Sequence, residues 1–391
     1  MIPGQGGRPP GDPPSPIHVL VGEYPPQPGG VADYTRQVAL GMAEAGLDVH
    51  VWAPGTEGDD REGGVCVHRA AGSWSRRDLE ALGARLDAFA GPRSILVQYT
   101  PNSWGYKGVN LGFCRWLKAR ARGGDRVRSM VHEAAYPWML RDKPTRLLAL
   151  PTIHRLMLRS LLSACERIWY STESMVPLFL RHGPADLPRT CLPVPSNVPT
   201  VDDPEGVAAL RREVAPDGSR IVGNFGLNAG LRPLLDAQGE RLLGSSGRVL
   251  LLIGRGGDRY AEELVRRRPE LDGRVKGTGG LDPESVSRHL QACDLVIQPY
   301  EDGVTTRRGT VMAALAQGCP VVTNRGERTE AKWWDGPGVA LGGHDWAEMA
   351  ALADRLLDDP GSREALGRAA RSLYAERFAL GRTVAAMREP W

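Results

Sequence analysis

Short apolar runs alternate with helical stretches along this chain of 391 residues, and the alternation begins twice. Residues 17–22 (IHVLVG) form an apolar run, a helical stretch follows from Val31 to Ala45, and residues 48–52 (DVHVW) form a second run. Strands that are apolar on both faces are typical of a parallel sheet covered by helices on both sides. The start of the chain therefore predicts a βαβ unit.

A proline-rich stretch at residues 192–204 separates two such series and suits an interdomain linker. After it, residues 220–226 (RIVGNFG), 248–254 (RVLLLIG) and 294–300 (DLVIQPY) again predict strands with helices between them. The sequence thus predicts an α/β protein of two Rossmann-like, doubly wound parallel-sheet domains that face a cleft. The predicted parts are a disordered leader at 1–16, an N-terminal domain at 17–195, a linker at 196–206 and a C-terminal domain at 207–370.

Composition and charge exclude several classes of protein. Hydrophobic residues make up 41% of the chain and charged residues 24%, as in globular proteins. A net charge of +3 is nearly neutral for this length, which argues against a nucleic-acid partner. The six cysteines show neither CxxC spacing nor a histidine at zinc spacing, so they predict reduced thiols and no metal site. Together with the lack of an apolar signal segment, this predicts a cytoplasmic protein.

The most apolar basic region runs from Arg146 to Ile168 and predicts an amphipathic helix. It lacks the roughly 20 uninterrupted apolar residues of a membrane span. Two interpretations of this region stay open. The apolar spacing suits a helix buried on one side, whereas the basic residues of Arg141–Arg159, among them Lys143 and Arg155, suit a surface for peripheral membrane contact.

The first glycine-rich stretch, residues 22–34 (GEYPPQPGGVADY), follows the first strand and opens the first helix. Gly29 and Gly30 allow a tight turn and close approach of a ligand, and the helix start that follows suits a phosphate. An ordinary strand-to-helix turn fits equally well. The stretch is not GxGxxG, and no acidic residue closes the second strand, which argues against a nicotinamide dehydrogenase.

Two shorter stretches end predicted strands. His132 in MVHE ends the strand at 126–132, where a neutral imidazole can orient or deprotonate an acceptor hydroxyl. A structural histidine is the alternative. Gly254 and Arg255 in LIGRGG end a second strand and suit a phosphate or a nucleotide, with a plain βα turn as the alternative.

The stretch at 298–323 is the most informative. A strand ends in QPYEDGVTTRRGT, a loop rich in glycine, hydroxyl and guanidinium groups, and a helix of small residues follows. Arg307 and Arg308 can pair with a diphosphate through two parallel hydrogen bonds each. Thr310 lies at the helix start, where phosphate is favoured. The alternative is a surface loop with two solvated arginines.

Together these stretches resemble glycosyltransferase family 4, the GT-B "group 1" transferases. YPPQPGGVADYT resembles that family's first glycine-rich loop, and MVHE resembles its acceptor-side histidine strand. WYSTESMVPLFLRHG resembles the elements that close the first domain. CDLVIQPYEDGVTTRRGTVMAALAQGCPVVT resembles the donor-domain signature, in the subgroup with a DGxTxRRG loop. LGRAARSLYAERFALGRTVAAM resembles the C-terminal helices that cross back, so 371–391 is expected to return to the N-terminal domain.

The resemblance implies transfer of a sugar from a nucleotide diphosphate sugar to an acceptor hydroxyl, with retention and without a metal or other cofactor. The acceptor would be a carbohydrate or a lipid-linked molecule, as in polysaccharide or glycoconjugate synthesis. His132 and Arg308 are the expected catalytic residues. The expected donor-binding residues are Gly29, Gly30, Gly254, Arg255, Gly303, Thr305, Thr306, Arg307, Arg308, Gly309 and Thr310, and the expected acceptor-binding residues are Asp33, Tyr34, Tyr99, Trp104 and Glu133.

The chain departs from the family pattern at two places. The family's two donor-domain glutamates correspond to Thr305 and Ala313. Its Arg and Lys after the first strand of the second domain are missing from residues 226–230, and Arg232 lies nearby but displaced. Arg255, Arg307 and Arg308 are expected to supply the missing charge. Two other functions stay open, a sugar-nucleotide epimerase on the same fold and a catalytically inactive nucleotide-binding partner protein.

Overall fold

The computed structural model describes residues 15–55, 58–69, 72–137, 144–226, 229–244, 247–343, 345–389 and 391. The predicted leader at 1–16 lies outside these residues except for Ser15 and Pro16. Arg141 and Lys143 of the predicted membrane-contact surface also lie outside them.

Contacts along the chain divide it into two compact units. Unit 1 comprises Met1–Ser171, Met175–Cys191 and Val384–Trp391, and unit 2 comprises Thr172–Ser174 and Leu192–Thr383. The chain therefore enters unit 2 within the proline-rich stretch, and the predicted linker at 196–206 lies inside unit 2. Of the predicted C-terminal helix, the part up to Thr383 belongs to unit 2 and the rest to unit 1.

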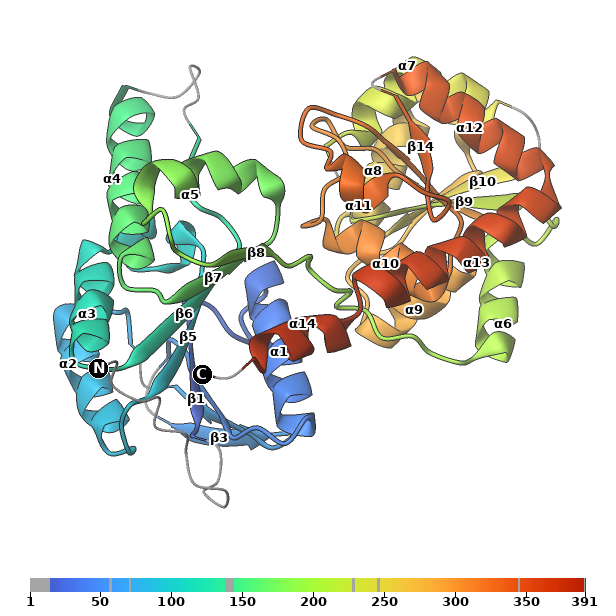
Figure 1. Cartoon of the computed structure of the whole chain (residues 1–391). Helices are drawn as coiled ribbons and strands as arrows, with labels where there is room; N and C mark the ends of the chain where they lie inside the picture. Colours follow the sequence, from blue (N-terminus) through green and yellow to red (C-terminus); the bar gives the residue numbers. More distant parts are fainter. Residues whose placement is uncertain are drawn as a thin grey trace. The chain divides into compact units, whose positions relative to one another are not determined.

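Unit 1 is built on an eight-stranded sheet with the order β3-β4-β2-β1-β5-β6-β7-β8 (Figure 1). Its pairs are parallel except β3–β4, and the register places Val19 beside both Val51 and Leu96. The strands are β1 (Ile17–Val21), β2 (Val49–Trp52), β3 (Asp59–Glu62), β4 (Val65–His68), β5 (Ser94–Tyr99), β6 (Arg126–Val131), β7 (Arg167–Tyr170) and β8 (Arg189–Cys191).

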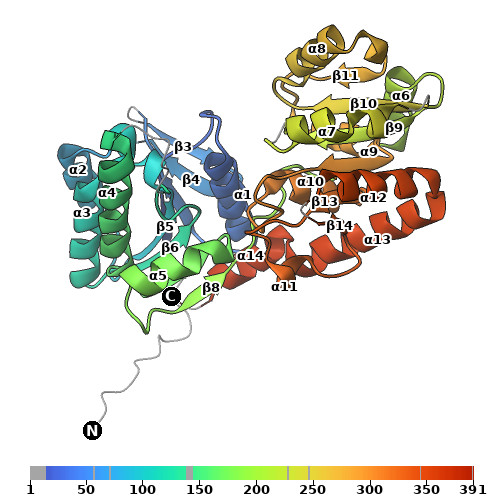
Figure 2. The same cartoon turned by 90° about the horizontal axis from the view of Figure 1, so that it is seen from above.

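Helices cover both faces of this sheet. One face packs against α2, α3 and α4, and α1 packs on the other, as Figures 1 and 2 show. Residues from Val384 also pack in unit 1, where the Trp391 ring lies 4.3 Å from the Arg128 guanidinium. The helices are α1 (Gly30–Glu44), α2 (Arg76–Asp87), α3 (Leu111–Arg122), α4 (Pro144–Leu162), α5 (Val176–His182) and, from Val384 on, the second half of α14 (Leu380–Met387).

Helix α4 corresponds to the predicted amphipathic helix. Met157, Leu158 and Leu161 are fully buried in the core of unit 1, whereas Leu156 on the opposite side is 50% exposed. The helix is therefore buried on one side, as its apolar spacing predicts. Among the described residues, no helix is long and apolar enough to cross a membrane.

Unit 2 is built on a six-stranded, all-parallel sheet with the order β11-β10-β9-β12-β13-β14. One face packs against α6, α9, α10 and α13, and the other against α7, α8 and α12. The strands are β9 (Arg220–Phe225), β10 (Arg248–Ile253), β11 (Val275–Gly277), β12 (Leu295–Gln298), β13 (Val321–Asn324) and β14 (Ala340–Gly342). The helices are α6 (Pro204–Val214), α7 (Leu231–Leu243), α8 (Gly257–Arg267), α9 (Pro283–Gln291), α10 (Gly309–Gln317), α11 (Ala331–Trp334), α12 (Trp346–Asp358) and α13 (Pro360–Arg377).

The two sheets confirm the predicted pair of Rossmann-like, doubly wound units. In each, the chain winds outward in one direction and then returns to continue on the other side of its first strand. This switch lies between β1 and β5 in unit 1 and between β9 and β12 in unit 2. Ligands of open α/β sheets bind at the carboxyl ends of the strands at such a switch point, so these two places are where a site is expected.

Candidate functional site

The switch point of unit 2 brings the loop after β9 against the start of α10. Gly226 has a φ of +84°, and a β-carbon added to it would lie 2.6 Å from Thr310 Cγ2. Only glycine fits this conformation and this close approach. The predicted helix start at Gly309 and Thr310 therefore lies at the carboxyl edge of the sheet.

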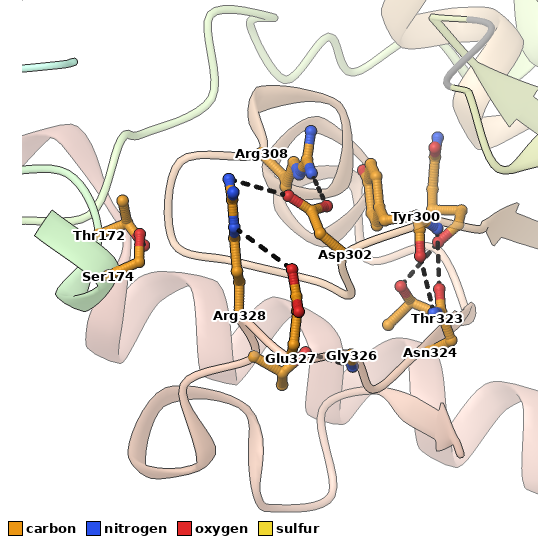
Figure 3. Close-up of polar contacts among 12 residues, drawn as sticks. Thr172, Ser174, Tyr300, Asp302, Arg308, Thr323, Asn324, Gly326, Glu327 and Arg328 are labelled. Carbon is orange, nitrogen blue, oxygen red and sulfur yellow. Dashed lines mark hydrogen bonds and ion pairs between the residues drawn. The ribbon is translucent and has the colours of Figure 1, made fainter. Parts of the chain in front are cut away.

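The loop after β12 is fixed against the loop after β13. The side chain of Asn324 accepts from Tyr300 N at 2.8 Å and donates to Tyr300 O at 2.8 Å (Figure 3). Gly303 has a φ of +85°, and a β-carbon added there would lie 2.2 Å from Gly326 N. Gly303 thus lets two backbones touch, which supports the loop that carries the predicted arginines.

Arg308 lies over an aromatic ring and beside a carboxylate. Its guanidinium lies 4.6 Å from the centre of the Tyr300 ring and pairs with Asp302, while Arg328 Nη1 lies 3.5 Å from the other oxygen of Asp302 (Figure 3). Two guanidinium groups therefore share one carboxylate, and Arg328 Nε also lies 3.9 Å from Glu327 Oε1. The Arg308 side chain is 25% exposed, so a ligand can reach it.

Tyr300 links this cluster to α10. Its hydroxyl lies 2.7 Å from Thr310 Oγ1. Burial raises the pKa of Tyr300 to about 12, so its phenol stays neutral near pH 7. Arg308, Tyr300 and Thr310 thus form one polar group at the start of α10, where the positive end of the helix favours an anion.

The other predicted residues of this loop lie differently. Arg307 is exposed, so the two arginines do not share one environment. Thr305 is 2% exposed and Thr306 is fully buried, so neither side chain presents a surface to a ligand in this arrangement. Thr306 instead donates from Oγ1 and from N to the carboxylate of Glu330, at 2.9 and 3.0 Å. Sequence reasoning missed Glu330, because no motif surrounds it.

A second polar surface lies where β10 turns into α8. Gly254 and Gly256 both have positive φ, +106° and +84°, which shapes the predicted turn and leaves Arg255 exposed. The turn borders a hollow of about 630 Å³. Its polar lining consists of Arg232, Arg255, Arg259, Tyr260, Glu263 and Glu301.

The charges of this hollow are partly paired. Arg232 lies 3.1 Å from Glu263, and its guanidinium lies 5.4 Å from the centre of the Tyr260 ring. Among the described residues, neither Arg255 nor Arg259 has an ion-pair partner. The structure therefore brings the displaced Arg232 together with Arg255, and the hollow can receive an anion.

In unit 1, the loops after β1 and β5 meet at the switch point. A β-carbon added to Gly22 would lie 2.4 Å from Ser103 O. Gly29 is the residue before α1, and one added there would lie 2.5 Å from Glu23 Oε1. Asp33 is exposed in the first turn of α1. Two carboxylates therefore border this turn, and they oppose the binding of a phosphate at Gly29 and Gly30.

His132 follows β6 and is 7% exposed. Its N donates to Tyr99 O at 2.8 Å, its Nε2 lies 2.9 Å from Gln98 Oε1, and its ring meets the Tyr34 ring edge to face at 4.6 Å between centres. The contact with Gln98 and the packing of Tyr34 fix the orientation of the His132 ring. Burial raises the pKa of Tyr34 well above its usual range, so this neighbour is neutral.

The other predicted acceptor residues separate into two groups. Glu133 lies at the carboxyl edge, where its Oε2 accepts from Thr100 Oγ1 at 3.4 Å. Tyr99 and Trp104 are fully buried in the core of unit 1, and the Trp104 ring stacks on Phe113 at 4.0 Å. Their aromatic side chains support the edge from below and present no surface to an acceptor in this arrangement.

Metal-binding residues do not gather in the described part of the chain. No group of three or more His, Cys, Asp or Glu side chains there has the geometry to hold a metal ion. The six cysteines are unbonded thiols, as their spacing predicts.

A known protein family matches part of unit 2. Residues 220–359 match the model of a family described as "Glycosyl transferases group 1". This match runs from β9 to the region after α12 and includes Arg308 and the start of α10. No curated protein matches the chain in sequence.

Solved structures match nearly the whole chain. Sucrose-phosphate synthase from Thermosynechococcus elongatus has a TM-score of 0.71 at 18% identity, over 95% of this chain and 97% of its own. WaaG, a glycosyltransferase of lipopolysaccharide biosynthesis, has a TM-score of 0.66 at 15% identity, over 96% and 100%. HepE from Anabaena, in complex with UDP and glucose, has a TM-score of 0.66 at 15% identity, over 95% and 99%.

The chain has the GT-B fold. This confirms the predicted fold class. At these identities the likeness establishes the architecture alone. The GT-B fold and the group 1 match of unit 2 together support a glycosyltransferase family, while the assignment to family 4 and to its DGxTxRRG subgroup stays a prediction.

Proposed function

We propose that this protein is a glycosyltransferase that moves a sugar from a nucleoside diphosphate sugar to an acceptor hydroxyl. Unit 2 binds the donor, and unit 1 binds the acceptor. One observation carries the proposal. Arg308, held between Tyr300 and Asp302, lies at the start of α10 at the switch point of unit 2, within the residues that match the group 1 model.

Arg308 and the start of α10 act on the diphosphate. A guanidinium can donate two parallel hydrogen bonds to phosphate oxygens, and the start of α10 adds the positive end of a helix. These groups stabilise the negative charge that grows on the leaving diphosphate. The arginines of the hollow beside α8, Arg232 and Arg255, add positive charge near the nucleotide.

His132 acts on the acceptor. Its Nε2 lies 2.9 Å from Gln98 Oε1, and Tyr34 packs against the ring, so the imidazole keeps one orientation. An imidazole held in this way orients an acceptor hydroxyl and receives its proton. Glu23, Asp33 and Glu133 are carboxylates at the same edge that suit the hydroxyl groups of a carbohydrate.

The stereochemistry of transfer and the independence from a metal are proposed from the resemblance to glycosyltransferase family 4. We propose retention at the anomeric carbon, and we propose that basic side chains and a helix end meet the diphosphate charge where a metal does so in other transferases. HepE was solved with UDP-glucose, and trehalose-6-phosphate synthase from E. coli with UDP-2-fluoro glucose. UDP sugars are therefore the first donors to test, with a carbohydrate or a lipid-linked saccharide as the acceptor.

Calorimetry with UDP, GDP and ADP tests the donor site. We expect the wild-type protein to bind one of them, and we expect Arg308→Ala to raise the dissociation constant about 10- to 100-fold, because hydrogen bonds to a charged group contribute about 1.5–3 kcal/mol. Arg368→Ala is the matched control, since Arg368 is an exposed arginine on α13. Equal affinity of the wild-type protein and Arg308→Ala would remove Arg308 from the donor site.

Incubation with a bound nucleotide sugar then separates the open functions. Sugar transferred to an added acceptor supports the transferase. Isomerisation of the donor without an acceptor supports the epimerase. Tight binding without turnover across a panel of acceptors supports a non-catalytic partner protein, as the absence of carboxylates at positions 305 and 313 suggests.

A further inference from the structure

A buried carboxylate lies behind the loop that carries Arg308. Glu330 is only 8% exposed and precedes α11. A buried carboxylate is costly unless hydrogen bonds satisfy it. Glu330 accepts from Thr172 Oγ1 at 2.5 Å, Glu173 N at 3.2 Å, Thr306 Oγ1 at 2.9 Å, Thr306 N at 3.0 Å and Trp334 Nε1 at 3.4 Å.

The first arm of this cluster fixes the loop. Glu330 takes the N–H and the hydroxyl of Thr306, and the Thr306 carbonyl accepts from Val194 N at 2.9 Å. All three polar groups of Thr306 are therefore held. Arg308 follows two residues later and precedes the first residue of α10. The position of the Arg308 backbone and of the helix start thus depends on Thr306.

The second arm holds the segment between β7 and α5. Thr172 and Glu173 donate to Glu330, and the Glu173 carboxylate pairs with Lys332. Contacts assign Thr172–Ser174 to unit 2, although the chain on both sides of this segment belongs to unit 1. Val194, on the other arm, follows closely after the chain enters unit 2 at Leu192. Thr172 and Val194, which lie beside two of the places where the chain passes between the units, are therefore bonded to Glu330 and to Thr306.

We propose that Glu330 is a positioning residue that holds the loop from Gly303 to Thr310 in its diphosphate-binding arrangement and anchors Thr172–Glu173 to it. The inference rests on the proposed function, because it takes this loop as the donor site. Hydrogen-bond donors that are already in position stabilise the charge of a bound ligand without the cost of reorganisation. A neutral side chain of equal size cannot accept from five donors, since an amide replaces one oxygen with an NH₂ group.

The test compares Glu330→Gln with Glu327→Gln. The control residue lies on the same loop after β13, but its side chain is 80% exposed. Hydrogen exchange is monitored by mass spectrometry on peptides that contain Thr306 and Glu173. It reports directly whether the hydrogen bonds to Glu330, called the clamp below, hold these two segments. In Glu330→Gln we expect exchange there to rise at least tenfold, and the dissociation constant for the nucleotide bound by the wild-type protein to rise about 5- to 20-fold. Both should stay within twofold in Glu327→Gln.

A pair of variants at the second arm guards against a loss of folding in Glu330→Gln. Thr172→Ser keeps the hydroxyl that donates to Glu330, and Thr172→Val removes it at nearly constant shape. We expect Thr172→Ser to match the wild-type protein in exchange at Thr306, and Thr172→Val to raise it. Exchange at Thr306 that is unchanged in both Glu330→Gln and Thr172→Val would overturn the proposal.

Hydrogen exchange and nucleotide binding test different parts of the proposal. A wild-type protein that binds neither UDP, GDP nor ADP contradicts the donor site of the proposed function, and it contradicts the role of Glu330 in donor binding, while exchange still decides whether the clamp exists. Faster exchange at Thr306 in Glu330→Gln with unchanged nucleotide affinity would show a structural clamp only, and it too would overturn the positioning role.

Discussion

The turn after β1 in unit 1 and the loop after β12 in unit 2 each border the switch point of their unit, and they differ in the charged groups that lie beside them. Both lie at a switch point, use glycines to bring backbones together and lead into a helix. Carboxylates of Glu23 and Asp33 border the first, whereas Arg308 lies at the second. Glycine spacing therefore predicts the turn, but the neighbouring charges decide which ligand it suits.

The two places also differ in what supports them. Beneath the edge of unit 1, Trp104 stacks on Phe113 and meets the Trp74 ring edge to face at 4.6 Å. The loop after β12 rests instead on polar groups, the side chains of Asn324 and Glu330. The stack of aromatic rings does not depend on any charged group, whereas the hydrogen bonds to Glu330 depend on its charged carboxylate. The predictions below test these differences.

The largest expected effect is on the stability of unit 1. Trp104→Ala should lower the free energy of unfolding by about 3–5 kcal/mol, because it removes a fully buried aromatic side chain and leaves a cavity. Trp104→Phe should lose much less, since a ring can still stack on Phe113. Chemical denaturation measures both. Equal stability of the Ala variant and the wild-type protein would show that Trp104 does not support this edge.

Acid should destabilise unit 1 next. Burial, together with His50 and His68 nearby, lowers the pKa of His18 from 6.5 to about 3. A histidine whose folded pKa is depressed stabilises the fold above pH 6.5, and this stability is lost as the pH falls from 6.5 toward 3. Between pH 7 and pH 5 the loss should be about 2 kcal/mol.

Denaturation at both pH values checks this, with His18→Gln as the comparison. The variant should lose this part of the pH dependence, because glutamine does not titrate and can still accept from Trp52 Nε1, which donates to His18 at 3.2 Å. The same pH dependence in both proteins would locate the acid sensitivity elsewhere.

Asp302→Asn tests the charge balance at Arg308. Asp302 and a diphosphate compete for the same guanidinium, so removal of the carboxylate should tighten nucleotide binding. The pair is partly exposed, and exposed pairs contribute only about 0.2–1 kcal/mol, so the gain should be about two- to fivefold. Calorimetry at two salt concentrations measures it. Weaker binding would mean that Asp302 orients Arg308 and does not compete.

The sequence predicts the parts of this fold that rest on local patterns. Buried strands such as β1 and β10 consist mostly of apolar residues, and their positions follow from this. The edge strands β3 and β14 were not predicted, because β3 (DDRE) is polar and exposed and β14 is short. Such strands form because a neighbour offers unpaired backbone groups, which no local pattern records.

Some features of the candidate site can likewise be predicted from local sequence patterns, and others cannot. The glycine turns and the placement of Arg308 at a helix start follow from the spacing in 298–323. The burial of Tyr99, Trp104 and Thr306 does not, since a strand end exposes or buries a side chain according to what packs on it. Glu330 could not be found from sequence, because its partners come from segments about 24 and 158 positions away.

The smallest expected effect belongs to the turn of unit 1. Glu23→Gln removes a carboxylate beside Gly29 without changing its size. If donor phosphates bind only at Arg308, the dissociation constant of the nucleotide should change less than twofold, because the turn of unit 1 holds no phosphate. Asp33→Asn should behave alike. Binding that tightens several-fold in either variant would show that these carboxylates repel a donor phosphate, and Gly29 and Gly30 would then be part of the donor site.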